Sequence, residues 1–446
     1  MKRFTYLAAL FSAAAIGAPV GTQTLWSLYA GQGTEKALLS AEPAPTPAPN
    51  PALSLAPASA PSAVTDTVWI NFATEGDNGI AHTGVVRYGN GIGWATKTVT
   101  GSFDCSNGAF GGDPSPGFEK KCQKQVTAPH VTQVAGAMPV INPAFVQTPA
   151  VVAAGSRLGG CVAGMSTCKS LGDTGVLNQD TGAMREPCRF SHFNFDDPIV
   201  YPGDAGKSHL HIYFGNVDAS ASTTPANVTK AAASTCFGGT LNNTAYWTPG
   251  LVDIRTGKPW VPEADGALFY YKGGYLGVKM ADIQPFPAGL RMIAGSAAST
   301  SENMDRGVIR IWCEHGDGTP RGRIPNCKRG EQLSFEVIFP QCWDGKNLDS
   351  PDHKSHMAYA NNGCPSTHPV PLPEISMNLH YIVEESGTDQ YLRLSSDNYA
   401  GLGGYSMHAD WFNGWDPATQ KLWVTNCINP SKDCHSALMG NGQWLY

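Results

Sequence analysis

The stretch SHLHIYFG, residues 208–215, carries a clear strand pattern. Short runs of aromatic and β-branched residues bounded by turn formers are typical of β-strands. His209 and His211 are two residues apart, so in a strand both imidazoles lie on one face, about 6.5–7 Å apart. Two imidazoles on one face can bind one metal ion, although two ordinary surface histidines give the same pattern. The stretch therefore predicts a strand and a candidate metal site.

Similar runs follow along the chain, each bounded by Gly, Pro or Asp and each four to eight residues long. They are residues 266–273, 290–295, 307–314, 333–340, 377–384 and 391–397. Many short strands with turn signals predict a mainly β fold, an antiparallel β-sandwich or jelly-roll with long loops. Residues 223–235, TTPANVTKAAAST, are the best candidate for a short helix. We see no repeat of constant period, which argues against a solenoid or propeller.

The N-terminus has the layout of a secretory signal peptide over residues 1–22, with Lys2 and Arg3 before an apolar run. An uncleaved signal anchor that tethers the protein to a surface is the alternative. Residues 23–66 are rich in Pro and Ala and predict an extended linker. No other stretch is apolar for long enough to span a bilayer. No transmembrane partner is evident from the sequence. We expect a secreted protein, extracellular or periplasmic.

The folded part divides into a small β-module with a connecting segment over residues 67–184 and a main β-domain over residues 185–446. The module contains the string VRYG, residues 86–89, which resembles a hairpin of small modules attached to secreted carbohydrate-active proteins. The chain has 12 Cys, an even number with no CxxC spacing, which predicts disulfides in an oxidising compartment. We expect the pairs Cys105–Cys122 and Cys161–Cys168. The net charge of -6 excludes a basic nucleic-acid-binding surface.

A second polar cluster lies in CWDGKNLDSPDHKSHMAY, residues 342–359. Turn formers and the absence of a period indicate a loop, which Cys342 and Cys364 would staple. Aspartates here can simply cap turns, and Asp349 before Ser-Pro fits that role. The candidate functional residues of this loop are Trp343, Asp344, Lys346, His353, His356 and Tyr359.

The third cluster is GYSMHADWFNGWD, residues 404–416. His408 and Asp410 are two residues apart, as His209 and His211 are, and Trp411 and Trp415 follow within five residues of Asp410. Aromatic faces stack on sugar rings while carboxylates hold hydroxyls, so this composition suits a sugar cleft. A packed aromatic corner of the sandwich is the alternative, above all for Trp415.

Five strings in this order resemble a secreted domain-of-unknown-function family, the one numbered nineteen ninety-six. They are DPIVYPGDAGKSHLHIYFGN, GLRMIAGS, FPQCWDGKNLDSPDHKSHMAY, CPSTHPVPLPEI and HADWFNGWD. The family occurs in fungi and bacteria, sometimes beside WSC or carbohydrate-binding modules. The resemblance covers roughly residues 190–427 and implies one polar site made of His209, His211, His353, His356, His408 and Asp410. It implies no established reaction.

The leading functional hypothesis is an exported enzyme, a hydrolase or lyase, acting on a polysaccharide or cell-wall glycan. In one version His209, His211 and His408 bind a divalent metal, zinc or calcium, that activates water. In the other, His353 or His408 is the general base and Tyr359 the acid, as a lyase needs. The predicted catalytic residues are His353, His356, His408, Asp410 and Tyr359; the predicted substrate-binding residues are Trp343, Asp344, Lys346, Trp411 and Trp415.

One alternative mechanism and one alternative function compete with this hypothesis. A two-carboxylate glycosidase could use Asp344, Asp352 or Asp410, but the three clusters contain no glutamate. The second function is a non-catalytic carbohydrate-binding or cell-surface protein, in which the histidines are structural. Imidazoles of His209, His353 and His408 that meet in an open cleft would favour the enzyme, and scattered or buried ones the binder.

Overall fold

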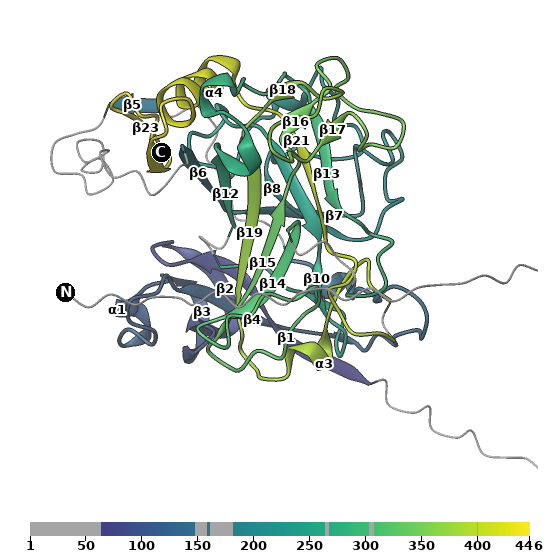
Figure 1. The fold of residues 1–446 in the computed structure, drawn as a ribbon. Coiled ribbons are helices and arrows are strands. Elements are labelled where there is room, and N and C mark those ends of the chain that lie inside the picture. Colours follow the sequence, from purple (N-terminus) through teal and green to yellow (C-terminus); the bar gives the residue numbers. More distant parts are fainter. Residues whose placement is uncertain (1–63, 148–157, 161–181, 264–266, 303–306, 399) are drawn as a thin grey trace, which may run out of the picture. The chain divides into compact units, whose positions relative to one another are not determined.

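The computed structural model describes residues 64–147, 158–160, 182–263, 267–302, 307–398 and 400–446 (Figure 1). The predicted signal peptide, almost all of the predicted linker and the predicted Cys161–Cys168 pair lie outside these residues. The part of the chain from residue 62 onward forms one compact unit. None of the helices in the described ranges combines the length and the apolar character that a membrane crossing requires.

The first four strands form an antiparallel sheet, called the β-module below, in the order β1-β4-β2-β3. Its strands are β1 (Thr65–Thr74), β2 (Ile80–Asn90), β3 (Gly93–Phe103) and β4 (Lys121–Pro129), with helix α1 (Asn107–Phe110) in the last loop. The β2–β3 hairpin turns within two residues, because Asn90 is paired with Gly93. Val86, Tyr88 and Val99 form part of its own small hydrophobic core, and the predicted Cys105–Cys122 disulfide closes the loop before β4.

The larger sheet of the main domain, the core sheet, has six strands in the order β14-β15-β19-β12-β6-β22. These are β14 (Ile309–Glu314), β15 (Gln332–Ile338), β19 (Glu374–Ile382), β12 (Ala267–Lys272), β6 (Ala183–Cys188) and β22 (Asp433–Ser436). All neighbours are antiparallel except β22 and β6. Burial alternates along β12, where Ala267, Phe269 and Tyr271 point into the core, as the period of a half-buried strand requires.

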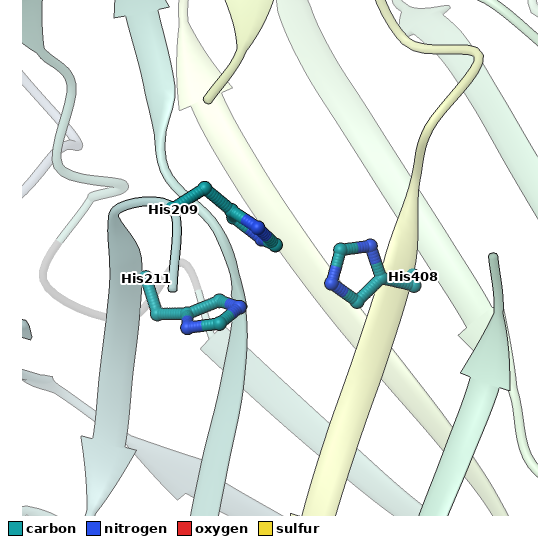
Figure 2. Close-up of side chains that lie close together, drawn as sticks. All are labelled: His209, His211 and His408. Carbon is teal, nitrogen blue, oxygen red and sulfur yellow. The ribbon is translucent and has the colours of Figure 1, made fainter. Parts of the chain in front are cut away.

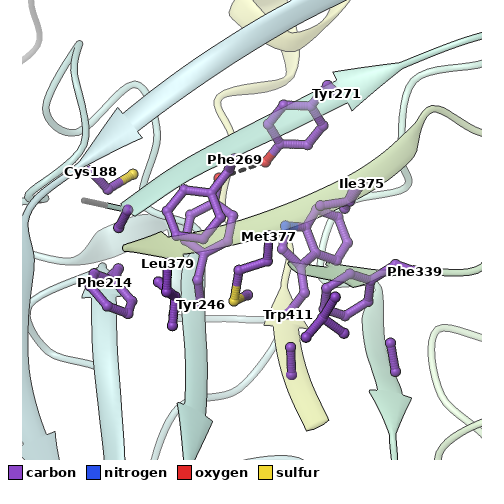
Figure 3. Packing of buried hydrophobic residues seen from close by; sticks show 14 of the residues in the cluster. Cys188, Phe214, Tyr246, Phe269, Tyr271, Phe339, Ile375, Met377, Leu379 and Trp411 are labelled. Atoms are coloured by element: carbon purple, nitrogen blue, oxygen red, sulfur yellow. Dashed lines mark hydrogen bonds between the residues drawn. The ribbon is translucent and has the colours of Figure 1, made fainter. Parts of the chain in front are cut away.

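The second sheet, the site sheet, has five antiparallel strands in the order β13-β21-β9-β8-β7. These are β13 (Arg291–Gly295), β21 (His408–Phe412), β9 (Ala245–Pro249), β8 (His211–Gly215) and β7 (Phe190–Asn194). Its inner face contributes Phe214, Tyr246 and Trp411 to the hydrophobic core that the core sheet shares (Figure 3). The structure confirms the predicted mainly β fold, and two sheets on one core are compatible with a β-sandwich.

The opposite face of the site sheet, the outer face, is also covered. Tyr213, Trp247 and Phe412 lie on it and form a second small core with Ile199 and Val228 from the loops between β7 and β9. All five residues of β8 and all five of β21 are buried as a result. Polar side chains on the outer face are therefore enclosed by protein.

The remaining elements are short and connect or cover the two large sheets. The strands are β5 (Leu158–Gly160), β10 (Leu251–Asp253), β11 (Lys258–Pro259), β16 (Cys342–Trp343), β17 (Met357–Ala358), β18 (Val370–Pro371), β20 (Leu392–Leu394) and β23 (Gln443–Leu445). The helical turns are η1 (Pro143–Phe145), η2 (Val228–Lys230), η3 (Tyr275–Gly277), η4 (Met280–Asp282), α3 (Thr388–Tyr391), α4 (Pro417–Trp423) and the π-helix η5 (Val424–Ile428). β5 pairs with β23, near the end of the chain.

The helix predicted for residues 223–235 is wrong, because this segment forms turns and only the short η2. The side chain of Asn227 accepts a hydrogen bond from the Thr224 amide at 2.7 Å and donates one to the Ser222 carbonyl at 3.0 Å. Such local bonds compete with helical ones. The bridge between Ser234 and Asn216 then ties the end of the segment to the site sheet.

Ten cysteines form five disulfides in the described part of the chain. The predicted pairs Cys105–Cys122 and Cys342–Cys364 are among them. The other three are Cys188–Cys236, Cys313–Cys327 and Cys427–Cys434.

Candidate functional site

Three histidine rings converge on the outer face of the site sheet and form the His cluster: His209, His211 and His408 (Figure 2). Ring centroids are 4.2 Å apart for His209–His211, 5.1 Å for His209–His408 and 5.9 Å for His211–His408. One nitrogen from each ring lies within 4.8 Å of the others, close enough for one metal ion to bind all three.

Strand pairing explains why residues so far apart in sequence meet. Trp247 of β9 is paired with Tyr213 of β8 on one side and with Asp410 of β21 on the other. His211 and His408 are each two residues before these partners, so they lie on the same face at the same level of the sheet. His209 precedes β8 by two residues and reaches the same point from its end.

Backbone carbonyls orient two of the rings. Nδ1 of His211 donates to the carbonyl of Asp196 at 2.9 Å, and Nδ1 of His408 donates to the carbonyl of Ser406 at 2.8 Å. Because a carbonyl only accepts, the proton of each neutral ring is on Nδ1 and the lone pair is on Nε2. Metal-binding histidines are commonly held by such a bond on the other nitrogen.

Two buried ring nitrogens have no hydrogen-bond partner in the part of the chain that the structure describes. Nε2 of His209 and Nε2 of His211 are both buried and make no hydrogen bond to any described residue. Buried polar atoms are nearly always bonded, so an unsatisfied pair side by side indicates a ligand that binds both.

Burial also fixes the charge state of the His cluster. It lowers the pKa of His211 to about 4 and that of His408 to about 4, since the charged imidazolium loses its hydration. Burial and the neighbouring rings lower the pKa of His209 still further. All three rings are therefore neutral at pH 7, the form that binds a metal ion.

Two carboxylates adjoin the rings. Oδ2 of Asp410 lies 3.8 Å from Nε2 of His408, and both Asp410 oxygens are buried without a hydrogen bond from the described residues. Ligand atoms of Asp197, His211 and Asp410 also fall within 4.8 Å of one another. Burial raises the pKa of Asp410 well above its usual range and raises that of Asp197. A cation at this point would offset the cost of two carboxylates in a desolvated site.

Asp197 is a site residue that the sequence analysis missed. It follows β7 in the loop NFDDPIV, and its Oδ1 accepts hydrogen bonds from the amides of Ile199 and Val200, both at 2.9 Å. The pair of aspartates before a proline was the available signal, but such a pair usually marks a turn.

Lys354 brings the second polar cluster to the edge of the site. Its Nζ donates to the carbonyl of Gly295 at 2.5 Å, and Gly295 is paired with His408. The positive charge of Lys354 adds a small part to the lowering of the pKa of His408, and it opposes the burial that raises the pKa of Asp410.

His356 is buried, and both of its ring nitrogens are engaged. Nδ1 lies 2.9 Å from Oγ of Ser350, and Nε2 lies 2.7 Å from the carbonyl of Arg291. The ring therefore has no free nitrogen for the proton transfer predicted for it. His353 is half-buried, and its Nδ1 bonds the carboxylate of Asp349 at 3.0 Å.

The other loop residues named as candidates serve local structure. The carboxylate of Asp344 accepts from the amides of Lys346 and Asn347 at 2.8 and 2.9 Å, which caps the turn. Nε1 of Trp343 donates to the Asn347 carbonyl at 2.6 Å, and the exposed Lys346 follows the turn. The hydroxyl of Tyr359 donates to the carbonyl of Ile338 at 2.8 Å, although 40% of the residue is exposed.

Trp411 and Trp415 do not form a sugar-stacking surface. They are 0% and 1% exposed and pack in the hydrophobic core, where Trp411 is surrounded by other core side chains (Figure 3). Nε1 of Trp415 donates to the hydroxyl of Tyr271 at 2.9 Å. For Trp411 the predicted sugar contact fails because successive residues of β21 face opposite sides, and Asp410 takes the outer face.

The fold and the site together define a mainly β protein with a buried centre of histidines and carboxylates. Residues 197–415 match the family model described as Domain of unknown function (DUF1996), and the chain belongs to this family. The match spans His209, His211, His408 and Asp410, and it begins at Asp197. No solved structure matches the chain.

Proposed function

We propose that this protein binds one divalent transition-metal ion at the His cluster and uses it to hydrolyse a bond in an extracellular glycan. The observation that carries the proposal is the set of neutral, convergent imidazoles, two of them with buried and unbonded Nε2 atoms. Imidazole nitrogens suit zinc and its neighbours in the first transition row, whereas calcium requires a shell of oxygens. The donor set therefore favours zinc over calcium.

The residues around the rings can support hydrolysis. A metal ion held by three histidines lowers the pKa of a bound water toward 7 and so supplies a nucleophile. Asp410, with its raised pKa and its carboxylate 3.8 Å from His408, is suited to take up a proton there. Asp197 could supply the fourth ligand or orient the water.

The lyase version is less well supported. It needs the hydroxyl of Tyr359 as an acid, but that hydroxyl donates to the carbonyl of Ile338. It also needs His353 or His408 as a base. Nδ1 of His353 is held by Asp349, and His408 is part of the convergent cluster.

The proposal of an extracellular glycan as the substrate rests on features outside the His cluster: the disulfides, the predicted N-terminal segments and the β-module. The disulfides are compatible with an oxidising compartment, and the predicted signal peptide and linker fit export. The β-module carries the VRYG string that resembles modules of carbohydrate-active proteins. These features support the substrate class, and the His cluster supports the chemistry.

Burial of the His cluster favours a second candidate, a non-catalytic extracellular carbohydrate-binding protein with a structural metal. His211 is 0% exposed and His408 is 4% exposed, as in closed structural metal sites. In that case the metal ion stabilises the site sheet and the glycan binds elsewhere.

Metal analysis of the purified full-length protein, combined with a panel of plant, fungal and bacterial polysaccharides, tests the proposal. We expect about one equivalent of zinc-type metal in the wild type and a loss of at least tenfold in His211→Ala. The matched control is His315→Asn, since His315 is exposed, lies outside the cluster and has a positive φ that Asn tolerates.

The panel separates the two candidates. Product release by the wild type and by His315→Asn but not by His211→Ala supports the hydrolase. Metal bound by the wild type without release from any polysaccharide contradicts the hydrolase and supports the structural metal. A wild type that takes up no metal overturns both metal-based candidates.

A further inference from the structure

A cavity of about 360 Å³ lies along β13, the edge strand of the site sheet that is the neighbour of β21. Half of its lining residues have aliphatic side chains, from β13, from β14 and the residue before it, from the segment after β15 and from β17. These are Ile293, Val308, Ile309, Pro340 and Met357. The volume lies in the range of pockets for small ligands, and the lining suits an apolar group.

The cavity adjoins the outer face at the level of the metal ligands. Ile293 and Gly295 line it, and they are paired with Asp410 and His408 respectively. Paired residues on neighbouring strands lie on the same face, with the strands about 4.8 Å apart. The cavity is therefore lined by the strand next to the one that carries His408 and Asp410.

The charged side chain that lines the cavity is positive. Lys354 is the one charged side chain among its described lining residues, and no carboxylate lines it. The ammonium of Lys354 gives one proton to the carbonyl of Gly295, and an ammonium carries three. A ligand that complements this cavity has an aliphatic chain and a single negative charge.

We propose that the cavity binds an aliphatic monocarboxylate, with the carboxylate on Lys354 and the chain among Ile293, Val308 and Met357. Resting on the function proposed above, this identifies the substrate class as a glycan that carries an acyl ester. In the hydrolysis, the oxygen of water bonds to the acyl carbon and the bond from that carbon to the sugar oxygen breaks. One proton of the water passes to the sugar oxygen and the other is released, leaving a carboxylate beside Lys354.

Calorimetric titration with octanoate tests the cavity directly. We expect the wild type to bind octanoate and Lys354→Met to bind it at least tenfold more weakly. Lys328→Met is the control, since Lys328 is exposed and does not line the cavity, and it should bind octanoate as the wild type does. Octylammonium has the chain with the opposite charge and should not bind. A wild type that does not bind octanoate, or equal affinity in Lys354→Met, overturns the assignment.

A second variant tests the chain site. Val308→Trp places a large ring in the cavity and should abolish octanoate binding while circular dichroism and metal content stay as in the wild type. If Val308→Trp does not fold, the comparison of Lys354→Met with Lys328→Met still tests the cavity assignment. Unchanged octanoate binding in a folded Val308→Trp protein contradicts the location.

The titration is independent of the metal. Octanoate binding that is retained in His211→Ala supports the cavity as a site of its own. Octanoate binding by a wild type that takes up no metal overturns the proposed hydrolysis and leaves the cavity assignment standing. Metal binding without octanoate binding overturns the cavity alone.

Discussion

At the scale of single residues, two buried histidines have different roles because their rings make different hydrogen bonds. In His211 the carbonyl of Asp196 engages one nitrogen and the other is left without a partner. In His356 a hydroxyl and a carbonyl engage both nitrogens. The first arrangement creates a ligand, and the second ties a loop to β13 through Arg291.

We expect His356→Ala to lower the free energy of unfolding by about 2–4 kcal/mol, since it removes two buried hydrogen bonds and leaves a cavity. Metal content should stay as in the wild type, because His356 does not belong to the His cluster. Urea unfolding and metal analysis measure the two effects. Loss of glycan hydrolysis at unchanged stability would instead restore the catalytic role predicted from the sequence.

At the scale of elements, the end of β13 depends on a glycine. Gly295 has a φ of 80°, and a Cβ there would lie 2.5 Å from the carbonyl oxygen of Met407 and 2.9 Å from Cα of His408. The pairing of β13 with β21 can therefore extend to His408 only if residue 295 is a glycine, which has no side chain.

We expect Gly295→Ala to destabilise the protein by about 2–3 kcal/mol and to weaken metal binding, because the backbone of His408 must move. Gly318→Ala is the matched control, since Gly318 has a φ of 64° and nothing within 4 Å of the added Cβ. The control should cost only about 1 kcal/mol, the price of the left-handed conformation. Equal losses of stability in the two variants would show that the contact with β21 is unimportant.

At the scale of the whole molecule, the core between the two sheets encloses a carboxyl group. Glu186 of β6 is 0% exposed, and its neighbours Met184 and Cys188 belong to the main hydrophobic core. Burial raises the pKa of Glu186 well above its usual range, although the backbone N–H of Phe237 acts in the opposite direction. The folded state therefore holds the proton of Glu186 more tightly than the unfolded state does.

This gives the stability a pH dependence of known sign. The contribution of protonated Glu186 is complete below the unfolded carboxyl pKa of about 4.3, and it falls as the pH rises toward the raised pKa of the folded state. Glu186→Gln should remove this loss, so the variant gains on the wild type by on the order of 1 kcal/mol or more between pH 5 and pH 8.

Urea unfolding of both proteins across this pH range measures the difference, and the other titrating groups cancel because both proteins contain them. Glu385→Gln is the exposed control and should follow the wild type. A constant difference between Glu186→Gln and the wild type at all pH values would contradict the burial argument.

The sequence by itself was enough to predict the strands, the mainly β class, two disulfides and the pair His209 and His211. These are local properties, because a period of two and the spacing of turn formers are written within ten residues. His408 was also predicted as the partner of these two histidines, but only the tertiary structure explains how it reaches them, since β9 is inserted between β8 and β21 by long-range pairing. Only the tertiary structure added Asp197. The tertiary structure also decided that Trp411 packs in the hydrophobic core and that Asp410 lies in the site. Because β21 is buried on both faces, its sequence does not alternate between polar and apolar residues in a way that shows which face is which.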